Sequence, residues 1–159
     1  MTMYRSRVCA TARCVGEAGY GGGLEALPFG VLTFVVGTLL VANAWAVVDA
    51  RGAVDAAARE GARSYVEAAD LGTAEETARS VATEAMVGHG RDPTRLELDI
   101  VAEGGFGRCA RVIVSATYPV PALRVPWVGD VGGPIEVTGH HSELVDPYRD
   151  GLEVTRSCD

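Results

Sequence analysis

The sequence predicts an α+β fold in which a long N-terminal transmembrane helix continues as a stalk into a small extracytoplasmic domain. Residues 26–48 lack charged side chains, the following stalk is rich in helix formers without proline, and the remainder combines one amphipathic helix with alternating strand patterns. We expect one helix and an antiparallel sheet of about three strands in that domain. The expected boundaries are 1–23 for a short basic head, 24–48 for the transmembrane helix, 49–70 for the stalk and 71–159 for the domain.

The uncharged segment has the length of one membrane span. As an α-helix rising about 1.5 Å per residue, residues 26–48 would be roughly 34 Å long, slightly more than the ~30 Å hydrocarbon core of a bilayer. Pro28 would fall in the first turn of a helix beginning near Leu24, where a missing N–H costs little. No other part of the chain is apolar enough to cover this segment, so we expect membrane lipid around it.

The charge distribution predicts the orientation of the span. The net charge is −7, but the head contains Arg5, Arg7 and Arg13 against one acidic residue, whereas residues 55–159 contain 18 acidic residues against 10 arginines. Basic flanks stay in the cytoplasm, so the N-terminus is expected inside the cell membrane and the domain outside. The acidic tail also argues against a nucleic-acid partner.

A cleaved signal peptide is a weaker alternative. Ala42-Asn43-Ala44 has the small-x-small pattern of a signal peptidase site at the end of an apolar run. Signal peptides have apolar regions of about 7 to 15 residues after a short basic head, and both segments are longer here. We therefore expect an uncleaved span at this position.

Small residues predict a packing face on the span. Thr38, Ala42 and Ala46 recur every four residues, and small side chains at this spacing let helices approach closely in lipid. Asn43 could add a hydrogen bond between helices. In an alanine-rich chain the same spacing also arises without any packing role.

A second helix is expected to begin at Thr73. Thr73-Ala74-Glu75-Glu76 has the pattern of a capping box, and an apolar stripe from Ala78 to Met86 follows it. Gly88 and Gly90 supply stop signals, and Pro93 follows the exit.

Strand patterns fill the rest of the domain. Residues 96–100 alternate between apolar and acidic side chains, and a return strand is expected from Arg108 to Tyr118 after the turn at 104–107. Prolines at 119, 121 and 126 predict an extended loop rather than a central strand, with Trp127 suited to a membrane interface. A third strand is expected over residues 134–142.

The four cysteines fall into two pairs. Cys9 and Cys14 lie in the head, whereas Cys109 and Cys158 lie in the domain expected to face an oxidising compartment. A Cys109–Cys158 disulfide would close a loop of about 50 residues, worth on the order of 4 kcal/mol in the chain-entropy model. The alternative is a free terminal thiol at Cys158 and a small buried side chain at Cys109.

Catalytic and metal-binding patterns are absent from the sequence. His140 and His141 precede Glu143 and Asp146, but adjacent strand residues point to opposite faces and no second ligand group has suitable spacing. No nucleophile motif or phosphate-binding loop frames the remaining candidates. We therefore expect no catalytic residue, no metal and no cofactor, and a protein that is not an enzyme.

In three features the sequence resembles TadE-like pilus assembly proteins, the minor pseudopilins of tight-adherence (Flp) pilus systems. They are the entry GYGGGLEALP at 19–28, the single uncharged span, and the stalk motif AAREGAR at 57–63. The resemblance covers Gly21 to about Val66, and the tail only by its pilin-like layout. It implies a membrane-anchored structural or assembly component of a pilus or related secretion system.

The resemblance also implies partners and site residues. Its partners would be other pilin or pseudopilin subunits, assembly platform proteins and a prepilin peptidase acting near Gly21. Glu25 would match the family's glutamate, which neutralises a neighbouring subunit's terminal amine. In the common pattern a glycine precedes the cut and glutamate is fifth after it, but here Tyr20 would precede that cut. The chain is therefore either processed at a neighbouring glycine or retains its head as an anchor.

A second function class fits the same layout. The chain could be a single-pass anchored extracytoplasmic binding module that does not polymerise. Neighbouring genes for a secretion ATPase and platform proteins would favour the pilus component, and a lone gene would favour the binding module.

Overall fold

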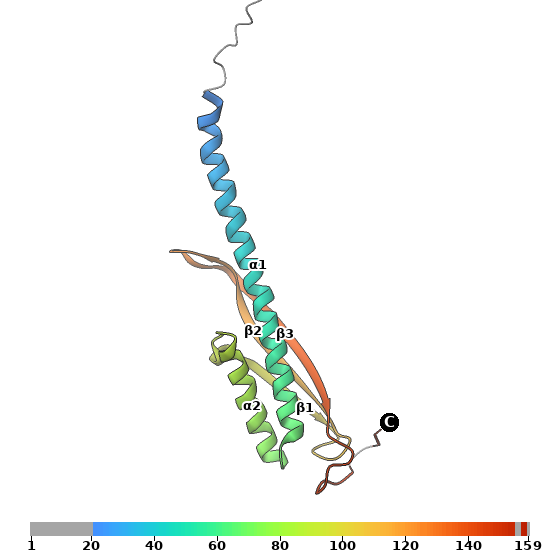
Figure 1. The fold of residues 1–159 in the computed structure, drawn as a ribbon. Helices are drawn as coiled ribbons and strands as arrows, with labels where there is room; N and C mark the ends of the chain where they lie inside the picture. Colours follow the sequence, from blue (N-terminus) through green and yellow to red (C-terminus); the bar gives the residue numbers. More distant parts are fainter. Residues whose placement is uncertain (1–20, 155–156, 159) are drawn as a thin grey trace, which may run out of the picture. The chain divides into compact units, whose positions relative to one another are not determined.

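The computed structural model describes residues 21–154, 157 and 158, with side chains described from residue 26. The elements are α1 (Gly21–Glu67), α2 (Leu71–Gly88), the short 3-10 helix η1 (Pro93–Arg95), β1 (Glu97–Glu103), β2 (Arg111–Val125) and β3 (Gly129–Leu144). The strands form one antiparallel sheet in the order β1-β2-β3 (Figure 1). The predicted α+β layout is confirmed.

The chain divides into two compact units, residues 1–38 and residues 39–159. The described part of the first unit is helical throughout. Helix α1 begins at Gly21, about one turn before the predicted start, so Pro28 lies inside the helix. Glycine has low helix propensity, which is why the run Gly21-Gly22-Gly23 favours a later start at the level of sequence.

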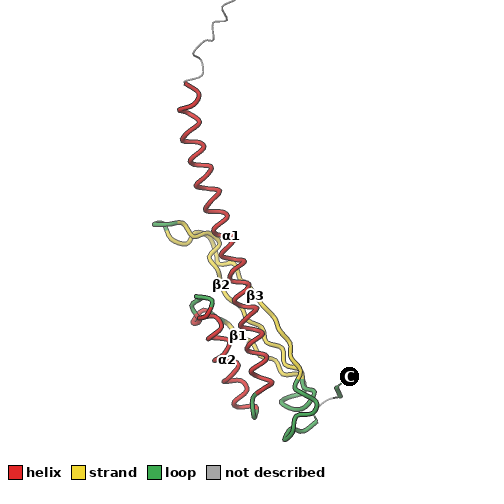
Figure 2. Tube along the Cα trace, in the orientation of Figure 1, coloured by secondary structure: helices red, strands yellow, loops and turns green. Residues whose placement is uncertain are grey.

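In the second unit two helices lie beside the sheet (Figure 2), and buried side chains of helices and sheet form one hydrophobic core. The part of α1 after residue 49 and the buried side of α2 contribute mostly alanines, and β2 contributes every second residue. The fully buried core side chains include Ala50, Ala53, Val54, Ala57, Ala58, Ala62, Tyr65, Ala74, Ala78, Ala82, Met86, Val112, Val114, Ala116 and Val120. The stalk is therefore part of the domain's core, as the small size of the tail predicts.

Two glycines allow the backbone of α1 to approach its neighbours closely. A Cβ on Gly61 would lie 3.4 Å from the carbonyl oxygen of Ala78 on α2. A Cβ on Gly139 of β3 would lie 2.8 Å from the backbone nitrogen of Asp55 and 2.8 Å from the carbonyl carbon of Val54. At Gly139 the sheet thus rests directly on the helix backbone.

Helix α2 begins at Leu71, two residues earlier than predicted. Asp70, rather than Thr73, is the N-cap: its Oδ1 accepts a hydrogen bond from the Thr73 backbone N–H at 3.1 Å, and the Thr73 hydroxyl contacts the Asp70 backbone N–H at 3.4 Å. The hydrogen bonds that the Asp70 carboxylate accepts from the Thr73 backbone N–H and from the Thr73 hydroxyl, the latter at 3.0 Å, hold the pKa of Asp70 below its ordinary value. The side chains of Asp70 and Thr73 can both cap a helix, and in the structure the helix starts after the earlier of the two. The helix ends at Gly88, as predicted.

The prediction of a proline-rich loop after residue 118 is wrong. Strand β2 continues to Val125 and pairs there with β3, although β1 pairs with β2 only as far as Thr117. One edge of β2 therefore has no strand beside it beyond that point. The Pro119 carbonyl accepts a hydrogen bond from Arg95 Nη2 at 2.9 Å, so Pro119 faces that free edge and its missing N–H interrupts no ladder bond. The register then shifts between Pro121 and Leu123.

We predict that Gly139→Ala destabilises the second unit. The new Cβ would collide with helix backbone, which cannot rotate away, so the free energy of unfolding should fall by about 1–3 kcal/mol or more. Gly133→Ala on the same strand is the matched control, because nothing lies within 4 Å of its Cβ, and it should change stability by less than about 0.5 kcal/mol. Urea unfolding of the full-length protein in detergent, followed by circular dichroism, measures both. Equal midpoints for the two variants would contradict the close packing.

Candidate functional site

The most exposed apolar surface of the described chain lies on α1. Most of its large side chains between residues 27 and 48 are exposed: Leu27, Phe29, Val31, Leu32, Phe34, Val35, Val36, Leu40, Val41, Trp45 and Val48. Among the described residues, α1 is the one helix long and apolar enough to cross a membrane, judged by length and composition. Gly21 and Glu25, two of the residues predicted for processing and packing, lie outside the part of the chain whose side chains are described.

The small residues predicted to form a packing face are divided in the structure. Thr38 and Ala42 are exposed, and the Thr38 hydroxyl donates to the Phe34 carbonyl of its own helix at 2.8 Å. Ala46 and Asn43 instead face the domain. The Asn43 Oδ1 accepts a hydrogen bond from the Arg124 backbone N–H at 2.6 Å, and its Nδ2 donates to the Leu39 carbonyl at 2.7 Å.

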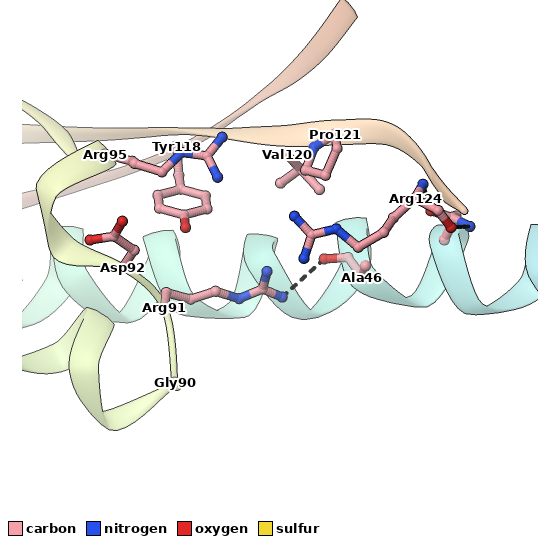
Figure 3. Close-up of a pocket in the computed structure, with 10 residues that line it drawn as sticks. Ala46, Gly90, Arg91, Asp92, Arg95, Tyr118, Val120, Pro121 and Arg124 are labelled. Carbon is pink, nitrogen blue, oxygen red and sulfur yellow. Dashed lines mark hydrogen bonds between the residues drawn. The ribbon is translucent and has the colours of Figure 1, made fainter. Parts of the chain in front are cut away.

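A cavity of about 340 Å³ lies beside these two residues, between α1, the segment after α2 and the distal half of β2 (Figure 3). Polar side chains converge on it from all three elements. Its lining residues are Asn43, Ala46, Gly90, Arg91, Asp92, Arg95, Tyr118, Val120, Pro121 and Arg124. Three arginines thus gather where the charge-free segment of α1 ends.

Each of these guanidinium groups already has an acceptor in the chain. Arg91 Nη2 donates to the Ala46 carbonyl at 3.1 Å and to Asp49 Oδ2 at 2.5 Å. Arg95 bonds to the sheet edge and lies over the Tyr118 ring, with 5.3 Å between the guanidinium carbon and the ring centroid. Arg124 pairs with Asp130 at 2.8 Å. Arg91 therefore joins the segment after α2 to the helix, Arg95 joins that segment to β2, and Arg124 joins β2 to β3.

The pair Arg124–Asp130 holds both groups in their charged forms. The hydrogen bond and charge of Asp130 raise the pKa of Arg124, and Arg124 lowers the pKa of Asp130. The pair bridges β2 and β3 just before their connecting turn. It is solvent-exposed, so it contributes little to stability, but it neutralises the two charges nearest the turn.

A fourth arginine closes the other end of α1. Arg149 donates hydrogen bonds to the carbonyls of Val66, Glu67 and Ala68, the one to Glu67 at 3.1 Å, and lies over the Phe106 ring at 5.9 Å. A cation at a helix C-terminus satisfies carbonyls that have no partner within the helix. Sequence reasoning missed Arg91, Arg95 and Arg149 because their partners lie 24 or more residues away along the chain. It also missed Arg124, whose partner Asp130 is six residues away across the β2–β3 turn.

The structure pairs Cys109 with Cys158 as a disulfide, with 5.0 Å between the Cα atoms. Cys109 is buried and Cys158 is exposed, so the bridge ties the C-terminal segment to the domain. Cys9 and Cys14 lie outside the described residues.

The two adjacent histidines of β3 have separate partners. His140 Nδ1 lies 2.9 Å from the Ser115 hydroxyl, and His141 Nε2 lies 3.0 Å from Glu143 Oε1. Within the described ranges, no group of three or more His, Cys, Asp or Glu side chains is arranged to hold a metal ion.

Comparison of the chain with protein-family models, curated proteins and solved structures found no match. Its function must therefore be inferred from its own residues. The two features available for this are the uncovered apolar surface of α1 and the braced cavity beside its end.

We predict that Arg91→Met weakens the second unit more than loss of an ordinary surface ion pair. The Arg91 side chain is only 18% exposed and has two acceptors, so its loss should cost about 1–3 kcal/mol of unfolding free energy. Arg63→Met is the control, since the Arg63–Glu67 pair on α1 is about two-thirds exposed on both sides and should cost less than about 0.5 kcal/mol. Urea unfolding in detergent compares them, and equal losses would show that Arg91 is not a brace.

Proposed function

We propose that the chain is a single-pass protein of the cell membrane and that lipid covers the first part of α1. The observation that carries this proposal is the row of exposed large apolar side chains, since fully burying one such side chain gains about 1.5–3 kcal/mol and burying a partly exposed one gains a proportion of that. Asn43 is hydrogen-bonded to the backbone of β2. The segment Ala26–Ala42 before it would be roughly 26 Å long as a helix, near the lower limit for one span.

The proposed orientation places the N-terminus in the cytoplasm and the second unit outside. The basic residues of the head support it, because positively charged flanks remain cytoplasmic. The Cys109–Cys158 bridge also supports it, since disulfides persist in oxidising compartments and are rare in the cytosol.

The proposed family is that of TadE-like pilus assembly proteins. The entry GYGGGLEALP and the motif AAREGAR support it. The motif has a clear packing role in this fold: Ala57, Ala58 and Ala62 are fully buried, and Gly61 admits the backbone of α2. A helix that carries both a span and the core of a small α+β domain is the layout expected of a pseudopilin.

In this role the protein works as a structural or assembly component of a tight-adherence pilus or related secretion system. Lateral packing of α1 against other subunits or platform proteins would hold it in the assembly, and the second unit would be displayed outside. Thr38 and Ala42 remain available for such packing, because both are exposed. Gly30 also leaves open space on the helix surface, beside an apolar groove lined by Ala26, Leu27, Val31 and Phe34.

Reporter fusions test the orientation. Alkaline phosphatase fused after Asp159 should be active in whole cells, whereas a fluorescent protein at the same position, exported unfolded, should be dark. A version with Arg5, Arg7 and Arg13 replaced by Gln is the matched variant, and it should lose part of the orientation bias. Fluorescence with inactive phosphatase in the unaltered chain would place the second unit in the cytosol and refute the proposal.

Substitutions at Ala42 test lateral packing. Ala42→Leu keeps the span apolar but blocks close approach of a second helix, so it should reduce co-purification with pilus subunits while membrane insertion is retained. Ala42→Glu should reduce co-purification more strongly than Ala42→Leu does, and it should also reduce membrane insertion, because a charged side chain is costly inside the membrane. Val41→Leu is the control, because a large side chain already occupies that position. Unchanged co-purification and piliation with both Ala42 variants would argue for an anchored module that does not polymerise.

A further inference from the structure

The turn between β2 and β3 exposes two apolar side chains. The Val128 backbone N–H donates to the Val125 carbonyl at 3.2 Å, which closes a tight turn around Pro126 and Trp127. Trp127 is 103% exposed and Val128 is 74% exposed. Nothing in the described chain covers either of them.

Trp127 also has a backbone conformation that disfavours it. Its φ is 65°, in the left-handed region that normally selects glycine or asparagine and that is uncommon for bulky residues. Such a conformation costs on the order of 1–3 kcal/mol and persists only where the surrounding structure enforces it. A glycine would remove this strain, so stability of the turn does not explain a tryptophan here.

The position of the hairpin along α1 indicates what covers the turn. Asn43 holds the Arg124 backbone N–H at 2.6 Å, one residue before Val125. Asp49, the first charged residue after the charge-free segment, lies about 9 Å further along the helix. All these residues belong to the second unit. The hairpin therefore meets α1 at the level of the charge-free segment, short of its polar end.

The sequence of the turn suits contact with lipid. Residues 125–129 have no charged side chain, and the charges that flank them, Arg124 and Asp130, neutralise each other at 2.8 Å. Trp45, the other tryptophan of the chain, is 70% exposed and lies only two residues after Asn43 on α1. Tryptophan is enriched where membrane hydrocarbon meets the headgroups, because its ring is apolar and its N–H is polar.

We propose that the apex of the β2–β3 hairpin, Val125–Gly129, inserts Trp127 and Val128 into the interface of the membrane that α1 crosses. The second unit then has a membrane contact of its own, the hairpin, in addition to its connection to the span. This inference rests on the proposed membrane span. The hairpin apex would contact the headgroups and upper acyl chains of the outer leaflet, not a soluble ligand.

Single-tryptophan variants of the full-length protein test this insertion separately from the span. Trp45→Phe leaves Trp127 as the only tryptophan, and Trp127→Phe leaves Trp45. Each is reconstituted in vesicles of phosphatidylcholine and phosphatidylglycerol, with and without lipids brominated high on the acyl chain. We expect blue-shifted emission and loss of intensity in brominated vesicles for both, with little quenching by aqueous iodide. Adding Asn43→Ala to the first variant should raise iodide quenching of Trp127.

Each contrary result has a distinct meaning. Lipid quenching of Trp45 with iodide quenching of Trp127 would overturn the insertion while leaving the span intact. Protection of Trp127 from both quenchers would show that a protein surface covers it, which also overturns the insertion. Iodide quenching of both tryptophans would refute the span and the insertion together.

Discussion

The packing of α1 against α2 and the sheet is the interaction on which the rest of the structure depends. Without the helix residues after 49, the second unit would keep only one helix and three strands, too little to enclose a core. Small residues make this packing close: alanines line the helix, and Gly139 lets β3 rest on its backbone. Before residue 43 the same helix exposes most of its large apolar side chains.

Polar braces mark both limits of the packed region. Arg91 binds the helix, Asn43 of the helix binds the backbone of β2, and Arg149 satisfies the last carbonyls of α1. All three bonds reach across more than 40 residues of sequence, so each closes a long loop.

The sequence predicted elements that depend on local patterns and missed those that depend on tertiary context. The apolar run of α1, the stripe of α2 and the alternation of β1 each follow from side-chain periodicity within one element. The proline-containing half of β2 could not be predicted in this way, because proline is tolerated there only where β1 has already ended. The N-cap was misplaced since Asp70 and Thr73 both have capping side chains.

In the candidate site, too, the sequence predicted the features that depend on local patterns and missed those that depend on tertiary contacts. Exposure of the apolar span follows from its composition, and Trp127 could be singled out by residue type alone. Asn43 was expected to bind another helix, but its partner is Arg124, 81 residues away, which no local pattern indicates. Only part of the predicted small-residue face is free to pack against another helix, because Ala46 lines the domain's own cavity.

A spin-label accessibility scan along α1 measures directly whether one helix passes from lipid into a protein core. Labels are placed at single cysteines from residue 29 to residue 65 in vesicles, with Cys9 and Cys14 replaced by Ser and the Cys109–Cys158 bridge retained. Positions 29–41 should be more accessible to oxygen than to a water-soluble nickel complex on all faces, and positions 50–65 should alternate with a period of about 3.6 residues between shielded and nickel-accessible. Higher accessibility to nickel than to oxygen throughout 29–41 would contradict a membrane span.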